Sequence, residues 1–113
     1  MDTTQLLKGV LDLAVLAVIK QHDSYGYDVV RQLRAAGITE ASDAAVYGTL
    51  RRLHAGGFLT TYMVTSEEGP SHRYYLLSDA GRALLAESSE RWRCFSGAMN
   101  ALLGAATERG EAA

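Results

Sequence analysis

Apolar residues follow helical patterns through the first third of the chain. From Leu6 to Ile19 nearly every residue is apolar, so a helix over this run would be buried on more than one side. Residues 1–5 before it form a polar lead-in. A second helix is predicted over residues 25–36, with Ser24 as its N-cap and Gly37 as its end.

The segment that begins at Ser42 predicts the helix with the clearest single face. The Ser42 hydroxyl is placed to accept a hydrogen bond from a free backbone N–H of the first turn. The apolar stripe has spacings of four and three and consists of Val46, Leu50 and Leu53. The opposite face carries side chains that form hydrogen bonds, and the pair Gly56-Gly57 ends the helix.

Two β-rich runs follow this helix and predict a hairpin. They are LTTYMVT, from residue 59, and HRYYLL, from residue 72, with a polar turn at 66–71 between them. Because side chains alternate between the two faces of a strand, one of Tyr74 and Tyr75 faces the core and the other lies on the outer side. Either assignment fits the pattern.

A long last helix is predicted to begin after Ser78, its candidate N-cap. Its stripe recurs at spacings of four and three and consists of Ala80, Leu84, Ser88, Trp92, Phe95, Met99 and Leu102. A helix of about 25 residues is ~37 Å long, too long for so small a domain to cover. We therefore expect the stripe to pack against a second copy of the chain, with residues 105–113 as a mobile polar tail.

The order of these elements is that of a winged helix-turn-helix, in which a recognition helix is followed by a β-hairpin wing. The fold class is mainly α with a small β-hairpin (α+β). Residues 1–77 form the predicted DNA-binding domain and residues 78–113 the C-terminal dimerisation helix and tail. The apolar run at 6–19 then packs against the last helix, either that of a second subunit or its own.

Four motifs resemble those of the PadR family of bacterial transcriptional regulators. In chain order they are LLKGVLDLAVLAVI, SYGYDVVRQL, VYGTLRRL and GPSHRYYLLSDAGRALL. The resemblance covers nearly the whole chain. The single long C-terminal helix is like that of the short subfamily of these regulators. The family often has proline where this chain has Gly48, so a preferred DNA sequence is not carried over from relatives.

Composition agrees with a globular domain but does not by itself indicate DNA binding. The 113 residues are 48% hydrophobic and 21% charged, with a net charge of −2. A basic patch is a local property that this sum hides. The apolar run near the start is interrupted by Asp12 and too short to span a bilayer. With no export signal and one cysteine, Cys94, we expect a cytoplasmic protein.

The predicted DNA contacts come from the recognition helix, the helix before it and the wing. The first half of the recognition helix is expected in the major groove, with Arg51 and Arg52 further along on phosphates. At the wing tip Glu67 and Glu68 repel phosphate, so the return strand provides the better contacts. The predicted set is Tyr25, Tyr27, Ser42, Ala45, Tyr47, Gly48, Thr49, Arg51, Arg52, His72 and Arg73.

Trp92 has two interpretations. In short members of the resembled family, two such residues from opposite subunits form the walls of a hydrophobic ligand pocket at the dimer centre. Flat aromatic molecules stack between indoles, and the pocket predicted on this basis consists of Leu6, Val10, Trp92, Phe95, Ser96 and Met99. In the other interpretation Trp92 is an ordinary core residue.

No catalytic, cofactor or metal-binding motif occurs in the sequence. We therefore expect a homodimeric repressor of its own or neighbouring genes, which binds a near-palindromic operator in double-stranded DNA. A small hydrophobic or aromatic effector at the dimer interface would relieve the repression. The alternatives are a winged-helix protein-interaction module without DNA binding and a repressor that responds to no ligand.

Overall fold

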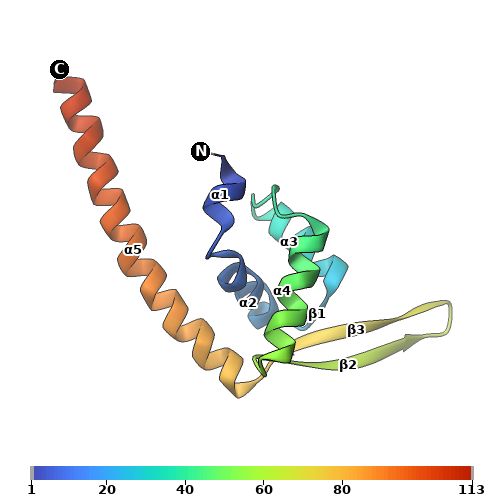
Figure 1. Cartoon of the computed structure of the whole chain (residues 1–113). Coiled ribbons are helices and arrows are strands. Elements are labelled where there is room, and N and C mark those ends of the chain that lie inside the picture. Colours follow the sequence, from blue (N-terminus) through green and yellow to red (C-terminus); the bar gives the residue numbers. More distant parts are fainter. Residues whose placement is uncertain (1, 113) are drawn as a thin grey trace.

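The computed structural model describes residues 2–112, and the described part is mostly helical with one small sheet (Figure 1). The predicted fold class is confirmed. The elements are α1 Thr3–Leu7, α2 Leu11–Gln21, β1 Ser24–Tyr25, α3 Gly26–Ala35, α4 Asp43–Ala55, β2 Leu59–Ser66, β3 Gly69–Leu77 and α5 Asp79–Ala112. Over residues 2–112 no helix combines the length and the apolar character needed to cross a membrane.

One hydrophobic core joins α2, α3, α4, the base of the hairpin and the first turns of α5. The predicted stripe of the recognition helix, Val46, Leu50 and Leu53, is buried in it. The other main members of the core are Val15, Leu16, Ile19, Val29, Val30, Leu33, Leu59, Tyr75, Leu77 and Leu85. Tyr75 is thus the core-facing tyrosine, and Tyr74 lies on the outer side of the sheet, half-buried.

The predicted starts of α4 and α5 and the predicted end of α4 are confirmed. Ser42 Oγ accepts a hydrogen bond from the backbone N–H of Ala45 at 3.1 Å. Ser78 Oγ accepts one from the N–H of Gly81 at 3.0 Å. The chain leaves α4 through Gly56 and Gly57, as predicted.

The apolar run at 6–19 does not form one helix, so that prediction is wrong. It is divided between α1 and α2, and Gly9 between them has φ +88°. This left-handed conformation is open to glycine at little cost and turns the chain out of the helix. The helix α1 begins at Thr3, inside the expected polar lead-in, and Asp2 caps it by accepting from the N–H of Gln5 at 3.1 Å.

A two-residue strand, β1, takes the place of the predicted N-cap at Ser24. It pairs with β3 in the register Ser24↔Tyr75 and Tyr25↔Tyr74, which gives an antiparallel sheet of order β1-β3-β2. Ser24 is fully buried in this strand, and α3 begins only at Gly26. The wing is longer than expected, because pairing continues to Ser66↔Gly69 and leaves only residues 67 and 68 as the turn.

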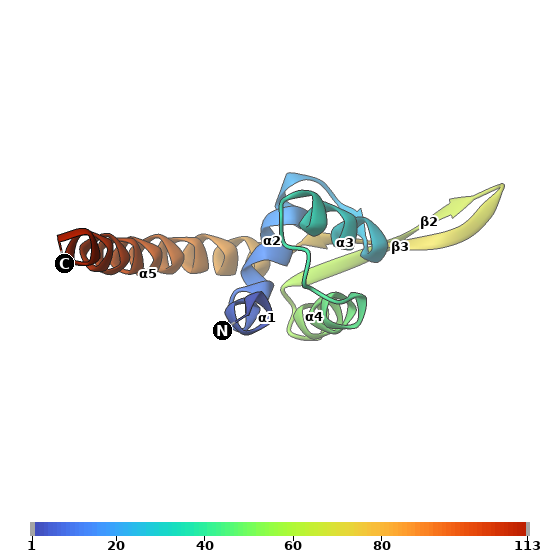
Figure 2. The same cartoon turned by 90° about the horizontal axis from the view of Figure 1, so that it is seen from above.

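The helix α5 extends away from the domain on one side and the hairpin on the other (Figure 2). It has 34 residues and continues to Ala112, so the predicted tail from residue 105 is wrong. Alanine, glutamate and arginine in that segment are strong helix formers and extend the helix after the apolar stripe has ended. The stripe itself is open in the single chain: Phe95 is 62% exposed and Leu102 66%.

Candidate nucleic-acid interface

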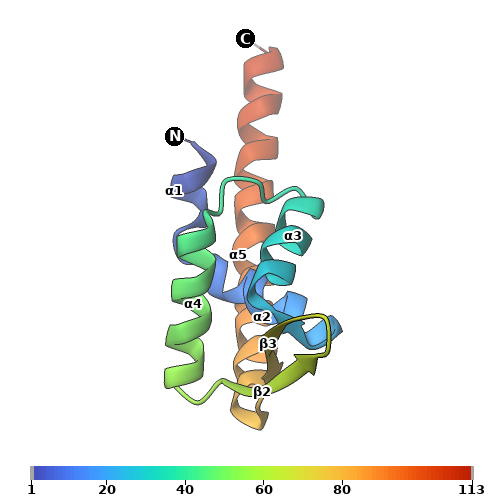
Figure 3. The ribbon, with the colours of Figure 1, turned by 90° about the vertical axis from the view of Figure 1, so that its right-hand side faces the viewer.

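The start of α3, the side of α4 and the strand β3 meet around one shallow hollow. These elements lie on the side of the molecule that Figure 3 presents. The hollow has a volume of about 420 Å³ and is lined by Tyr25, Gly26, Tyr27, Tyr47, Ser71, His72, Arg73 and Tyr75. Five of these residues belong to the predicted set of DNA contacts, and we call this surface the tyrosine hollow.

A close approach between α3 and α4 forms the floor of the tyrosine hollow. The ring of Tyr47, on α4, packs directly against Gly26, the first residue of α3. A Cβ on Gly26 would overlap Cε1 of that ring and lie 2.9 Å from Cδ1, closer than carbon atoms approach. Glycine is therefore required at position 26 for the two helices to meet in this way.

Aromatic contacts fix the wing to the start of α3. The rings of Tyr25 and His72 stack with centroids 4.6 Å apart, and Tyr74 adds a tilted contact with Tyr25 at 5.5 Å. Arg31 donates to the Tyr25 hydroxyl at 3.4 Å, and its guanidinium lies 5.4 Å from the ring centre of Tyr27. The return strand is thereby placed beside the first backbone N–H groups of α3.

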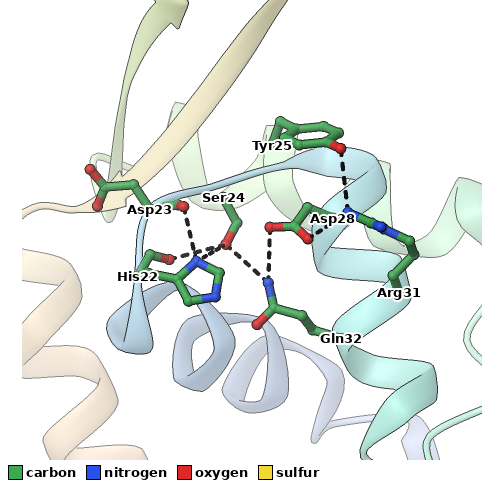
Figure 4. Close-up of polar contacts among 7 residues, drawn as sticks. All are labelled: His22, Asp23, Ser24, Tyr25, Asp28, Arg31 and Gln32. Atoms are coloured by element: carbon green, nitrogen blue, oxygen red, sulfur yellow. Dashed lines mark hydrogen bonds and ion pairs between the residues drawn. The ribbon is translucent and has the colours of Figure 1, made fainter.

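A hydrogen-bond network behind this surface holds the connection between α2 and α3 (Figure 4). Ser24 Oγ donates to the carbonyl oxygen of His22 at 3.0 Å and accepts from Gln32 Nε2 at 3.3 Å. Gln32 also donates to Asp28 at 3.0 Å, and the same carboxylate accepts from Arg31 at 3.0 Å. Because the buried hydroxyl of Ser24 has partners, the start of α3 is fixed without a side-chain N-cap.

The arginines near the tyrosine hollow differ in their partners. Arg52 forms a two-point ion pair with Asp12 of α2, at 2.7 and 3.0 Å. This carboxylate raises the pKa of Arg52, chiefly through the hydrogen bond. Arg51 and Arg73 form no ion pair with any residue of the described part of the chain. Asp12 thus holds the guanidinium in the single chain, and the phosphate contact of Arg52 stays a prediction.

The predicted DNA contact of Thr49 is wrong. This residue is 4% exposed and lies on the buried side of α4, because it follows Val46 by three positions and so shares its helical face. The remaining predicted residues of α4 are at the surface: Ser42 and Ala45 are exposed and Gly48 is half-buried. At the start of this helix Asp43 is paired with Arg34 of α3 at 2.9 Å.

A second, apolar groove lies between α1, α2 and α5. It has a volume of about 880 Å³, and five of the six predicted ligand-pocket residues line it: Leu6, Val10, Trp92, Phe95 and Met99. Ser96 does not line this groove and donates instead to the carbonyl oxygen of Arg93 at 3.3 Å. Trp92 is 46% exposed, so it is not a core residue of the single chain.

The described part of the chain contains no metal-binding cluster and no pair of cysteines that would form a further site. Among residues 2–109, whose side chains the structure describes, no three His, Cys, Asp or Glu side chains come together in a way that could hold a metal ion. Cys94 is exposed on α5, with its Sγ 3.9 Å from a carboxylate oxygen of Glu90.

The sequence pattern did not identify two parts of the tyrosine hollow: the lining residue Ser71 and the network behind Ser24. Each depends on contacts between segments that lie apart in the chain, so helical or strand periodicity carries no signal for them. The doublet Tyr25-Gly26 at a helix start is the one local sign of a close approach.

The helix pair α3–α4 followed by a hairpin is the arrangement of winged helix-turn-helix DNA-binding proteins. Residues 15–87 match the Transcriptional regulator PadR-like family, and the chain belongs to this family of transcriptional regulators.

Solved structures with the same fold include several regulators. A PadR-like transcriptional regulator from Bacillus cereus is 33% identical, with a TM-score of 0.80 over 88% of this chain and 96% of that one. A Streptococcus transcriptional regulator is 32% identical, with a TM-score of 0.77 over 87% and 96%. Bacillus subtilis PadR, solved in complex with operator DNA, is 24% identical, with a TM-score of 0.63 over 69% and 46%. At that identity the likeness to the last protein concerns the fold.

Proposed function

We propose that this chain is a homodimeric transcriptional repressor that binds a near-palindromic operator upstream of its own or a neighbouring gene. The observation that carries the proposal is the tyrosine hollow, where Tyr47, His72 and Arg73 meet the N-terminus of α3. Residues 1–77 would form the DNA-binding part and residues 78–113 the dimerisation part. The protein would act in the cytoplasm, where its DNA lies.

Phosphate binding at the tyrosine hollow is supported by charge and by backbone geometry. The first N–H groups of α3 have no partner within the helix, and a helix N-terminus favours an anion. Arg73 adds a guanidinium that forms no ion pair with the described residues, and the side chains of Tyr27 and His72 are exposed. With a phosphate held there, α4 would lie along the major groove, with the wing beside the backbone.

Dimerisation is supported by the open stripe of α5. At 34 residues the helix is about 51 Å long, and its second half extends away from the rest of the domain (Figure 1). An apolar stripe of this extent on a soluble protein indicates an interaction surface. Pairing of two such helices would place two copies of α4 about one DNA turn apart.

An effector site is proposed in the apolar groove beside Trp92. Its lining is mostly apolar and its volume suits a small hydrophobic or aromatic molecule. A ligand there would contact both α1 and α5, and would release DNA by favouring a dimer whose recognition helices no longer match the half-sites. Trp92 is the single tryptophan of the sequence, so quenching of its fluorescence by planar aromatic molecules tests access to this groove.

Binding to the DNA upstream of its own gene, measured across a salt series, tests the proposed function. Replacing Arg73→Ala should weaken binding to all sequences and reduce the slope of log affinity against log salt by about one per protomer. Arg82→Ala is the matched control, since Arg82 is exposed on α5 away from the apolar stripe and paired with Asp79 at 3.0 Å. It should leave affinity and slope unchanged.

A folded dimer that binds neither this DNA nor other promoters would contradict the proposal. The protein-interaction alternative would then be favoured. The dimer could also bind DNA while no planar aromatic molecule quenches its tryptophan fluorescence. That result would support the repressor and contradict the proposed effector site.

A further inference from the structure

The exposed face of α4 is almost free of side chains along its middle. Successive helical residues advance by about 100°, so the stripe of Val46, Leu50 and Leu53 fixes which direction faces the core. On the opposite side the central positions are Ala44, Gly48 and Ala55, none of which extends beyond a methyl group. This lets the helix approach the floor of a DNA groove closely.

Arg51 and Arg52 flank this bare line, roughly 50° to either side of its centre, and their environments differ. The Arg52 guanidinium is held on the α2 side by both oxygens of Asp12, at 2.7 and 3.0 Å. Arg51 has no ion pair among the side chains of residues 2–109. Its Nη2 lies 3.9 Å from the position that a Cβ on Gly48 would occupy.

The position of the Arg51 guanidinium over Gly48 brings it toward the first half of α4. Helical side chains point back toward the helix N-terminus, over the residues three and four positions earlier. The first half of a recognition helix is the part that contacts base edges. Tyr47, the other large side chain here, is held against Gly26 at the tyrosine hollow, away from the middle of the face.

We infer that Arg51 is a specificity-determining residue that contacts the edge of a guanine, and that Gly48 provides the space in which its guanidinium lies. The planar fork of arginine matches O6 and N7 of guanine in the major groove with two hydrogen bonds. Arg52 is a positioning residue, which ties the recognition helix to α2 through Asp12. The inference rests on the proposed DNA binding and assigns a chemical role within it.

Selection from a pool of random duplex DNA, followed by sequencing, tests the inference. The wild-type dimer should enrich sites with one guanine per half-site that is preferred by roughly 5- to 150-fold over other bases. Arg51→Ala and Arg51→Lys should both lose this preference while preferences at other positions remain. Lysine keeps the charge that a phosphate contact needs but lacks the two-point fork, so Arg51→Lys separates the two roles.

Two glycine-to-leucine substitutions provide a matched pair. Gly48→Leu keeps Arg51 but fills the space beside its guanidinium, and should lose the same guanine preference. Gly97→Leu makes the same change on α5, where nothing lies within 4 Å of the added carbon, and should keep it. Circular dichroism and urea unfolding of each variant establish that the fold is intact.

Three results would overturn the inference. If Arg51→Ala enriches the same sequences with the same preferences as wild type, Arg51 does not select a base, although DNA binding itself stands. If Arg51→Lys retains the full preference, the two-point contact of the guanidinium fork is not what selects guanine. If the folded wild-type dimer enriches no sequence at all, the proposed function fails together with the inference.

Discussion

At the scale of single residues, the contact between Gly26 and Tyr47 determines how the tyrosine hollow is formed. Replacing Gly26→Ala would force a methyl group into the Tyr47 ring. Overpacking of this kind costs about 1–3 kcal/mol, and we expect that loss in the free energy of unfolding measured with urea. DNA affinity should fall as well, because Tyr47 and the start of α3 would have to move apart.

The control for this variant is Gly48→Ala, on the exposed face of the neighbouring helix. There the added methyl group meets nothing closer than 3.9 Å, and alanine favours a helix interior over glycine by about 1 kcal/mol. The protein should become more stable. Equal stability of Gly26→Ala and wild type would contradict the close approach.

Tyr62 provides a titration that reports the contact between the wing and the α2–α3 connection. Its hydroxyl donates to a carboxylate oxygen of Asp23 at 2.9 Å, and this hydrogen bond is the main reason that the pKa of Tyr62 is raised above its ordinary value of 10.0. The contact therefore contributes stability below that ordinary value, and the contribution is lost as the pH rises through the raised pKa.

We expect the pKa of Tyr62 to fall toward its ordinary value in Asp23→Ala. An ultraviolet absorbance titration measures this when the curve of Tyr62→Phe is subtracted, because the other tyrosines then cancel. A pKa that Asp23→Ala leaves unchanged would mean that the hydrogen bond is absent in solution.

Residue roles were predictable only where they depend on neighbours in the sequence. Ser42 and Ser78 were identified as caps because a cap bonds three residues ahead. The pairing of Arg52 with Asp12 spans 40 positions, and no local pattern contains it. The hydroxyl of Thr49 favours exposure, whereas its position on the helix puts it on the buried side.

At the scale of elements, the break between α1 and α2 depends on Gly9. Its φ of +88° costs a residue with a Cβ roughly 1–2 kcal/mol. Nothing lies within 4 Å of the position that a Cβ would take, so Gly9→Ala isolates the backbone effect. We expect the free energy of unfolding to fall by about that amount in urea or thermal unfolding.

Gly97→Ala, in the middle of α5, is the comparison. It also has nothing within 4 Å of the added carbon, but its φ is not positive, so alanine should stabilise the helix by up to about 1 kcal/mol. Opposite signs for the two variants are expected. If Gly9→Ala were as stable as wild type, the left-handed turn would not be a feature of the folded protein.

Helices with a single apolar stripe and clear start and stop signals were predicted correctly. The break in the run at 6–19 and the short strand β1 were not predicted. The helix α4 has a single stripe, a cap and a glycine stop, so several local signals agree. The apolar run at 6–19 has no such agreement of local signals, and its pattern of apolar residues does not indicate the break at Gly9. The strand β1 is two residues long, which is too short for alternation to be recognised, and it exists because β3 pairs with it.

At the scale of the whole molecule, the central prediction is a dimer formed through α5. Phe95→Glu puts a charge into the middle of the open stripe and should convert the dimer to a monomer in sedimentation equilibrium. The fold of the DNA-binding part should persist, since Phe95 is 62% exposed in the single chain. DNA affinity should fall with the loss of the second half-site contact.

Ala101→Glu is the matched control for this variant. Ala101 is also exposed on α5 but is turned away from the stripe, roughly 120° from Phe95 when each residue advances by about 100°. This variant should remain dimeric. A dimer that survives Phe95→Glu, with its dissociation constant unchanged, would rule out the stripe as the interface.

Hydrogen exchange of the backbone amides, with and without operator DNA, tests the account most directly. The first N–H groups of α3, at Gly26 and Tyr27, have no helical partner and should exchange quickly in the free protein. On DNA they should slow, together with residues 43–52 and 71–74, because phosphate and the groove then cover them. Slowing confined to α5, or DNA binding with no change at the start of α3, would contradict the tyrosine hollow as the nucleic-acid interface.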